Sequence, residues 1–211
     1  KHDPCLLFRK DLIVIVYVDD LGIQAPTATI VDNLINNLLS KGFQLTREGT
    51  FSEYLGIQYQ RSDDNSVNMV QTGLIQKILE ATGMTECNPN KTPSTREALG
   101  SDLEGECMDD SWNYRSVVGM LLYLATNTRP DIAYAVSQVA RFSHSPKKSH
   151  ATAVKMIVRY LSGTINKGVV YRKPEHFTLD CYVDADFAGL YGIESSEDST
   201  SVKSRTGYII S

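Results

Sequence analysis

The run "LIVIVYV", residues 12–18, is the feature that most limits how this chain can fold. It is rich in β-branched residues and apolar at consecutive positions, so both faces of the strand that it predicts are apolar. Such a strand belongs in the middle of a sheet, with a neighbour on each side. Asp19 and Asp20 follow directly, which places two adjacent carboxylates at the end of an apolar strand.

The flanking residues predict the neighbours of this strand. "PCLLFR", residues 4–9, reads as a strand joined to it by a turn, and "LGIQA", residues 21–25, reads as a short strand that returns antiparallel. Asp19 and Asp20 then form the connecting turn. Apolar residues recur at helical spacing over residues 27–41, and Gly42 stands where a helix commonly ends, so this segment predicts an amphipathic helix.

The rest of the chain alternates between further strands and helices. A hairpin is predicted over residues 51–72 and a helix from about residue 74 to Gly83. Residues 86–110 contain two prolines and two glycines and predict a linker. Three helices are expected at about 111–126, 130–143 and 146–162, the last two with Pro130 and Pro146 at the first helical position. Strand-like segments return after residue 163, so the fold class is α+β with at least two units.

Composition sets limits but names no function. The chain has 211 residues, 42% of them hydrophobic, and a net charge of −4, so any nucleic-acid partner must be met by a local basic surface. Its four cysteines lack the spacing of a zinc site or a disulfide framework, which favours a reducing, intracellular setting. No run approaches the roughly 18 apolar residues of a membrane span, so no membrane partner is expected.

Two adjacent carboxylates repel each other unless a cation lies between them. Hard oxygen ligands suit Mg²⁺, and paired carboxylates are what two-metal phosphoryl transfer requires. Two alternatives remain at this point. Aspartate is common in β-turns because its side chain accepts hydrogen bonds from nearby backbone N–H groups, and an isolated Ca²⁺ or Mg²⁺ site in an unrelated fold would use the same residues.

Several motifs resemble the reverse transcriptase of copia-type retrotransposons. "LIVIVYVDDLGI" is similar to the palm-domain motif of that family, and "FSEYLGIQ" to its primer-gripping hairpin. The stretch with "TRPDI" and "RYLSGT" resembles the region beyond the palm, and "YVDADFAG" with "SRTGYII" the opening of an RNase H domain. The resemblance implies a palm-type antiparallel sheet with packed helices (1–85), a linker (86–110), a helical connecting region (111–165) and the first strands of an RNase H-like sheet (166–211).

The resemblance also implies roles for individual residues. Asp19 and Asp20 are expected to be catalytic metal ligands, with Tyr17 and Val18 on the floor under the primer terminus and the nucleotide. Ordinary strand packing is the alternative for the last two. Residues 55–57 (Leu55, Gly56 and Ile57) match the primer grip, where Gly56 would let nucleic acid approach the backbone; a simple hairpin bulge is the alternative.

Both active sites are expected to be incomplete in this chain. The family uses a third aspartate, which would precede Lys1, and further RNase H carboxylates, which would follow Ser211. In the RNase H-like part Asp184 is the expected catalytic metal ligand and Asp186 an accessory residue; a solvated strand end is the alternative for Asp184. The resemblance implies two Mg²⁺ ions per site, with Mn²⁺ as a substitute, and no polymerase or RNase H activity for this chain alone.

A local basic surface is predicted on the helix that follows Pro146. Lys148, Lys155 and Arg159 lie within about 40° of one another around its axis. They could follow the phosphate backbone of a nucleic acid or simply form a solvated face. His144, His150 and His176 have no metal-ligand spacing, and Trp112 and Tyr114 are expected to be packing residues.

The expected activity is RNA-directed DNA synthesis on a template–primer with deoxynucleoside triphosphates, within a retrotransposon polyprotein located in a cytoplasmic particle or the nucleus. The alternative is a decayed or co-opted remnant that binds nucleic acid or protein without catalysis.

Overall fold

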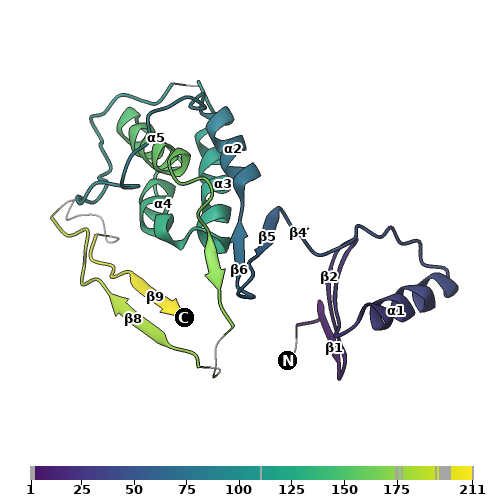
Figure 1. Cartoon of the computed structure of the whole chain (residues 1–211). Coiled ribbons are helices and arrows are strands. Elements are labelled where there is room, and N and C mark those ends of the chain that lie inside the picture. Colours follow the sequence, from purple (N-terminus) through teal and green to yellow (C-terminus); the bar gives the residue numbers. More distant parts are fainter. Residues whose placement is uncertain are drawn as a thin grey trace. The chain divides into compact units, whose positions relative to one another are not determined.

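The computed structural model describes residues 3–109, 111–173, 176, 178–192, 194 and 201–210. The chain forms two compact units, residues 1–55 and 56–211, which are described separately (Figure 1). Both combine small antiparallel sheets with helices, as the predicted α+β class requires. The palm, linker, connecting-region and RNase H-like boundaries expected from the sequence stay predictions.

The first unit is built on a three-stranded antiparallel sheet in the order β1-β2-β3. The apolar run forms β2, Leu12–Tyr17, which pairs on one side with β1, Leu6–Arg9, and on the other with β3, Asp20–Gln24. The predicted central position of this strand is therefore confirmed. A short strand, β4, Glu53–Tyr54, ends the unit.

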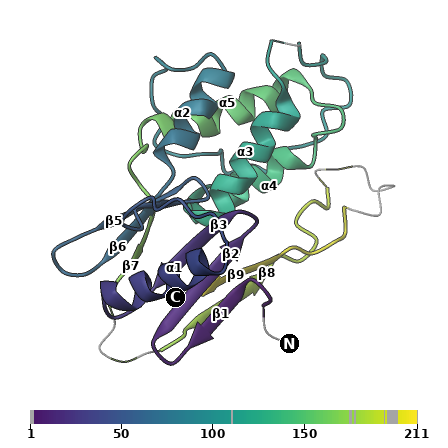
Figure 2. The same cartoon turned by 90° about the vertical axis from the view of Figure 1, so that its right-hand side faces the viewer.

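One helix lies along this sheet. It is α1, Ala28–Ser40, and both views show it against one sheet face (Figure 1; Figure 2). Leu12 on the more buried face is 8% exposed, whereas Ile15 and Tyr17 on the opposite face are 41% and 53% exposed. The helix ends as predicted, with Gly42 at a φ of +91° that favours glycine.

The second unit combines a bundle of helices with two small sheets. In the larger sheet β6 pairs antiparallel with both β5 and β7, so segments about a hundred residues apart in the chain share one sheet. The smaller sheet is the antiparallel hairpin of β8 and β9. The elements are β5, Ile57–Arg61; β6, Val67–Val70; α2, Thr72–Ala81; α3, Tyr114–Asn127; the 3-10 helix η1, Pro130–Ile132; α4, Ala133–Ala140; α5, Lys148–Ser162; β7, Val169–Tyr171; β8, Cys181–Ala185; and β9, Thr206–Ile210.

The helices α2 to α5 enclose the main hydrophobic core. Trp112 and Tyr114 belong to it, with their rings stacked at 5.7 Å, so their predicted packing role is confirmed. The Tyr114 hydroxyl donates to the Val139 carbonyl at 2.9 Å, and burial raises the pKa of this tyrosine. The fully buried aliphatic residues of this core include Ile75, Ile78, Leu121, Leu124, Ile132, Val154 and Leu161.

A buried arginine ties the motifs "TRPDI" and "RYLSGT" together. Arg129 is 1% exposed, and its guanidinium donates to both carboxylate oxygens of Asp131, at 2.9 and 2.7 Å. It also donates to the carbonyl and the hydroxyl of Thr164, at 3.0 and 2.8 Å. The Tyr160 hydroxyl donates to Asp131 at 2.7 Å. Arg129, Asp131, Tyr160 and Thr164 therefore form a cross-link between the start of η1 and the end of α5.

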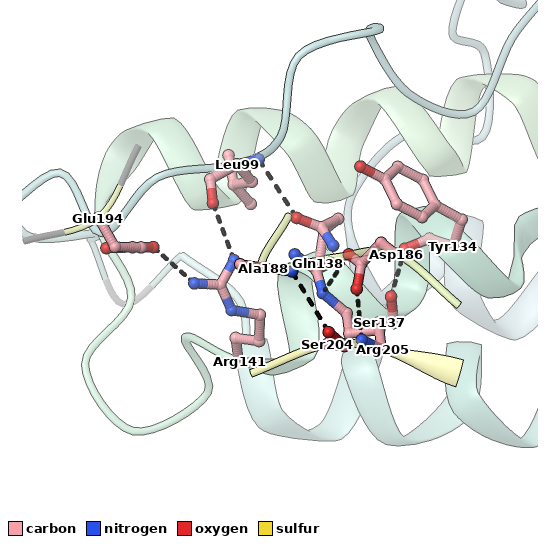
Figure 3. A network of polar contacts seen from close by, with 10 residues as sticks. All are labelled: Leu99, Tyr134, Ser137, Gln138, Arg141, Asp186, Ala188, Glu194, Ser204 and Arg205. Atoms are coloured by element: carbon pink, nitrogen blue, oxygen red, sulfur yellow. Dashed lines mark hydrogen bonds and ion pairs between the residues drawn. The ribbon is translucent and has the colours of Figure 1, made fainter. Parts of the chain in front are cut away.

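The irregular segment over residues 86–109 packs against the helices. The Leu99 N–H donates to the side-chain oxygen of Gln138 at 3.3 Å, and Arg141 donates to the Leu99 carbonyl at 3.1 Å (Figure 3). Arg141 also forms an ion pair with Glu194 at 2.5 Å. Gln138 of α4 and Arg141, which caps this helix, thus contact Leu99, and Arg141 also contacts Glu194 after β8.

The predicted helix start at Pro146 is wrong by two residues. The helix α5 begins at Lys148, after a cap at Lys147. His150 explains the shift, because its Nδ1 accepts the Lys147 N–H at 3.0 Å while its Nε2 donates to the Gly100 carbonyl at 3.0 Å. The imidazole is fully buried and stacks on Phe142 at 3.9 Å. The histidine is therefore structural and neutral, consistent with the absence of a predicted catalytic role.

Acid is expected to weaken the fold through His150. Burial lowers the pKa of its imidazole below the usual 6.5, and the charge of Arg141 adds to this, although the Gly100 carbonyl and the charges of Asp102 and Glu194 oppose it. The unfolded chain therefore binds this proton first, so stability is full above pH 6.5 and declines as pH falls through the lower folded-state value. Urea unfolding at pH 7.5, 6.5 and 5.5 measures the decline.

The matched variant for this prediction is His150→Gln. It should be less stable than wild type at pH 7.5, because it loses the two hydrogen bonds, but its urea midpoint should vary less between pH 7.5 and 5.5. His144→Gln, which changes an exposed histidine, should keep the wild-type pH dependence. An unaltered pH dependence in His150→Gln would show that other groups cause the decline.

Candidate functional site

The two adjacent aspartates lie at the tip of the β2–β3 hairpin. Tyr17 pairs with Asp20 across the strands, so Val18 and Asp19 form a two-residue turn. Both aspartates were expected in the turn; Asp20 is instead the first residue of β3. Val18 has a φ of +51°, a conformation that sterics disfavour for a β-branched side chain. The strained turn lets two consecutive carboxylates stand at one end of the hairpin.

Nothing within the described part of the chain neutralises these carboxylates. Asp19 and Asp20 are exposed, and neither side chain forms an ion pair or a hydrogen bond with a described residue. The β-turn alternative, in which an aspartate side chain accepts from the local backbone, is therefore not what the hairpin shows. Two free carboxylates fit a hard divalent cation. Among the described residues no group of three or more potential metal ligands forms, so this pair supplies only part of a coordination shell.

The predicted floor residues are available to a ligand. Tyr17 is 53% exposed and Val18 is 82% exposed, so strand packing within the described structure does not bury either side chain. Tyr17 shares a sheet face with Asp20, because paired residues of antiparallel strands point to the same side.

Two aromatic residues that the sequence did not single out lie against this hairpin. A Cβ added to Gly22 would meet the Phe51 ring at 3.0 Å, so the ring covers β3 where a side chain is missing. The Tyr54 ring lies 5.4 Å from the Phe51 ring. Burial raises the pKa of Tyr54, and the charges of Asp20, Cys5 and Tyr17 add to this. Gly22 was the sequence signal for this contact, because a glycine inside a strand often marks a place where another part of the chain approaches the backbone closely.

The primer-grip-like residues form a second strained turn. Leu55 and Gly56 have φ values of +53° and +71°, and two successive positive values are typical of a tight hairpin turn. Leu55 is exposed, whereas Ile57 is 7% exposed and packs inside the second unit. The backbone at Gly56 is open, because an added Cβ would meet no atom within 4 Å.

The predicted RNase H-like carboxylate lies on an exposed hairpin. Asp184 is in β8 opposite Gly207, and one of its carboxylate oxygens accepts the Ala185 N–H at 2.8 Å. Asp186 follows the strand and is held by Arg205, whose backbone N–H donates to it and whose side chain lies 3.6 Å away (Figure 3). Asp184 is thus the freer of the two carboxylates for a cation.

The predicted basic stripe on α5 is only partly free. Lys148 forms an ion pair with Glu106, and this contact raises the pKa of the lysine. Lys155 and Arg159 are exposed, and neither side chain forms an ion pair within the described ranges. Two of the three predicted cations therefore remain available to an anionic partner.

No helix in the part of the chain that the structure describes is long and apolar enough to cross a membrane.

Comparisons with known proteins show which family this chain resembles. The family of reverse transcriptases (RNA-dependent DNA polymerases) matches residues 7–96. The retrovirus-related Pol polyprotein from transposon RE1 of Arabidopsis thaliana is 36% identical over 96% of this chain, and that from transposon TNT 1-94 of Nicotiana tabacum is 32% identical over 98%. An uncharacterized mitochondrial protein of Arabidopsis thaliana is 33% identical over 84% of this chain and 72% of its own length.

The chain spans 13% of the RE1 polyprotein and 16% of the TNT 1-94 polyprotein. No solved structure matches it. The family match over the YVDD hairpin and the Pol relatives across nearly the whole chain agree with each other. The chain belongs to the reverse transcriptase family of copia-type retrotransposon Pol polyproteins.

Proposed function

We propose that this chain supplies two of the metal-binding carboxylates of an RNA-directed DNA polymerase. The observation that carries the proposal is the tip of the β2–β3 hairpin, where Asp19 and Asp20 stand adjacent, exposed and without an ion pair among the described residues. A pair of unneutralised carboxylates is costly unless a cation binds there. The Pol polyproteins that this chain resembles are consistent with such a role.

In the proposed site Asp19 would be the main ligand of Mg²⁺ and Asp20 an auxiliary ligand. When bound, the ions neutralise the phosphoryl group being transferred and lower the pKa of the attacking hydroxyl. Tyr17 and Val18 position the primer terminus and the incoming nucleotide, and the residues around Gly56 support the primer backbone. The protein contributes mainly positioning and electrostatics, because this reaction needs no nucleophilic side chain. Further ligands come from other parts of the polyprotein.

A second site of the same chemistry is proposed on the β8–β9 hairpin, where Asp184 would bind a cation for cleavage of RNA in a hybrid. Asp186 forms an ion pair with Arg205, so we assign it only an accessory role in cation binding. The remaining ligands of this site also come from the rest of the polyprotein.

Metal removal tests the proposed chemistry. A Pol polypeptide that contains this chain is expected to extend a DNA primer on an RNA template only when deoxynucleotides and a divalent cation are present. Chelation by EDTA should stop extension and added Mg²⁺ or Mn²⁺ should restore it, as gel analysis of the labelled primer would show. Extension that persists in EDTA would contradict the proposed metal site. A purely nucleic-acid-binding remnant would bind template–primer under both conditions and never extend it.

The free cations of α5 are expected to contact phosphates. Lys155→Ala and Arg159→Ala should each weaken binding of an RNA–DNA hybrid and reduce the slope of log affinity against log salt by about one unit. Lys148→Ala is the matched control, because that lysine is already paired with Glu106 and should change the slope less. Fluorescence anisotropy between 50 and 200 mM salt measures the slopes. Equal slopes in all four proteins would show that α5 is only a solvated face.

A further inference from the structure

The hydroxyl of Tyr54 is buried beside the proposed metal site and lacks a partner. Its oxygen has almost no accessible surface and forms no hydrogen bond with any described residue. Buried hydroxyl groups nearly always have a partner, because leaving one unpaired costs its full desolvation free energy. An exception beside a candidate site therefore calls for a functional explanation.

The Tyr54 ring is held in place by its packing. The Phe51 ring lies 5.4 Å from it, with the two ring planes inclined at 34°. Phe51 in turn lies against Gly22, where an added Cβ would meet the ring at 3.0 Å. Gly22 is two residues after Asp20 on the same strand, so both occupy the same sheet face. The aromatic pair thus covers the face from which the Asp20 carboxylate projects.

This packing therefore puts the Tyr54 hydroxyl, a donor without a partner among the described residues, on the sheet face that carries the Asp20 carboxylate, which also lacks one. The charge of Asp20 acts on Tyr54 and helps to raise its pKa, second only to burial. The other two groups that act on this hydroxyl are the Cys5 thiol and the Tyr17 hydroxyl, which are weaker hydrogen-bond acceptors than a carboxylate. A carboxylate has about four acceptor positions, so one oxygen can bind a cation while the other accepts a hydrogen bond.

We propose that Tyr54 is a positioning residue whose free hydroxyl donates a hydrogen bond to Asp20 when a divalent cation binds, and so orients this carboxylate toward the cation. This inference rests on the proposed metal site at Asp19 and Asp20. Hydrogen bonds from outer residues commonly orient metal-binding carboxylates, and their loss lowers metal affinity. The hydroxyl acts through Asp20 and touches neither the nucleotide nor the cation.

Tyr54→Phe isolates the hydroxyl, because the ring and its packing on Phe51 remain. Titration of the 211-residue chain with Mn²⁺, followed by electron paramagnetic resonance of the free ion, should show about 10-fold weaker binding in this variant. Tyr171→Phe, which changes an exposed tyrosine of β7, should bind Mn²⁺ like wild type. A purely structural hydroxyl would leave Mn²⁺ affinity unchanged, and its removal would raise the urea midpoint.

The pairing with Asp20 is tested by a double-mutant cycle. In an Asp20→Asn background the further change Tyr54→Phe should have much less effect on Mn²⁺ affinity, because the hydrogen-bonded carboxylate is already lost. Equal effects in both backgrounds would overturn the pairing. The same variants in primer extension by a Pol polypeptide should show a raised Mg²⁺ requirement and lower kcat for Tyr54→Phe, with the deoxynucleotide KM unchanged.

The outcomes separate this inference from the proposed function. Mn²⁺ binding that weakens in Asp19→Asn but not in Tyr54→Phe would leave the metal site standing and refute the role of Tyr54. Mn²⁺ binding that is unaffected by Asp19→Asn would refute the metal site and with it this inference.

Discussion

Replacing Asp19 with asparagine is expected to lower the rate of primer extension by a Pol polypeptide about 1,000-fold. Asparagine keeps the size of the side chain but removes its charge. A cation that stabilises transition-state charge contributes several kcal/mol, and each 1.36 kcal/mol corresponds to a factor of ten in rate. Because Asp19 has no partner among the described residues, its charge has no structural task there, so stability should not fall.

The measurement is single-turnover extension of a labelled primer in Mg²⁺, together with the urea midpoint of each protein. Asp63→Asn is the matched control, since it changes an exposed aspartate in the turn between β5 and β6 and should extend the primer at the wild-type rate. A variant at Asp19 that keeps more than a tenth of the wild-type rate would refute the metal-binding role of this carboxylate.

Replacing Asp131 with alanine is expected to lower the free energy of unfolding by about 3 kcal/mol, near the low end of the range for breaking a buried ion pair. The change removes the carboxylate that accepts two hydrogen bonds from the fully buried Arg129 and one from Tyr160. The guanidinium keeps its hydrogen bonds to Thr164 and its position over the Tyr160 ring, 5.4 Å from the ring centroid, but loses its counter-charge. The side chain of Asp131 is 39% exposed, so water can partly replace it, which limits the loss.

Urea unfolding followed by circular dichroism tests this prediction. Asp11→Ala is the matched control, because it breaks the exposed pair of Arg9 and Asp11 and should leave the midpoint unchanged. Burial raises the pKa of Asp131, but hydrogen bonds from Arg129 and Tyr160 and the charge of Arg129 outweigh it and lower the pKa below its usual value. This stabilisation is present above pH 4 and is lost as pH falls through the folded-state value. Equal midpoints for Asp131→Ala and wild type would show that the arginine is held by packing alone.

Local sequence patterns predicted the strands and helices correctly wherever interactions between sequence neighbours determine the structure. The continuous apolar run of residues 12–18 and the turn residues after it predicted the β2–β3 hairpin, and the helical spacing of residues 27–41 predicted α1 with its glycine end. Both rest on backbone preferences and on periodicity, which are properties of the sequence itself. The error at Pro146 has a non-local cause, because His150 satisfies the Lys147 N–H and is itself held by Gly100, fifty residues earlier.

The sequence alone determined the family, the paired carboxylates and the order of strands and helices, since these depend on residue types and on spacing along the chain. Only the tertiary structure decided which charges are free. It paired Lys148 with Glu106 and Asp186 with Arg205, left Asp19, Asp20, Lys155 and Arg159 without ion pairs among the described residues, and placed the Tyr54 hydroxyl without a partner. The physical reason is that burial and pairing arise between residues distant in sequence, which no local pattern records.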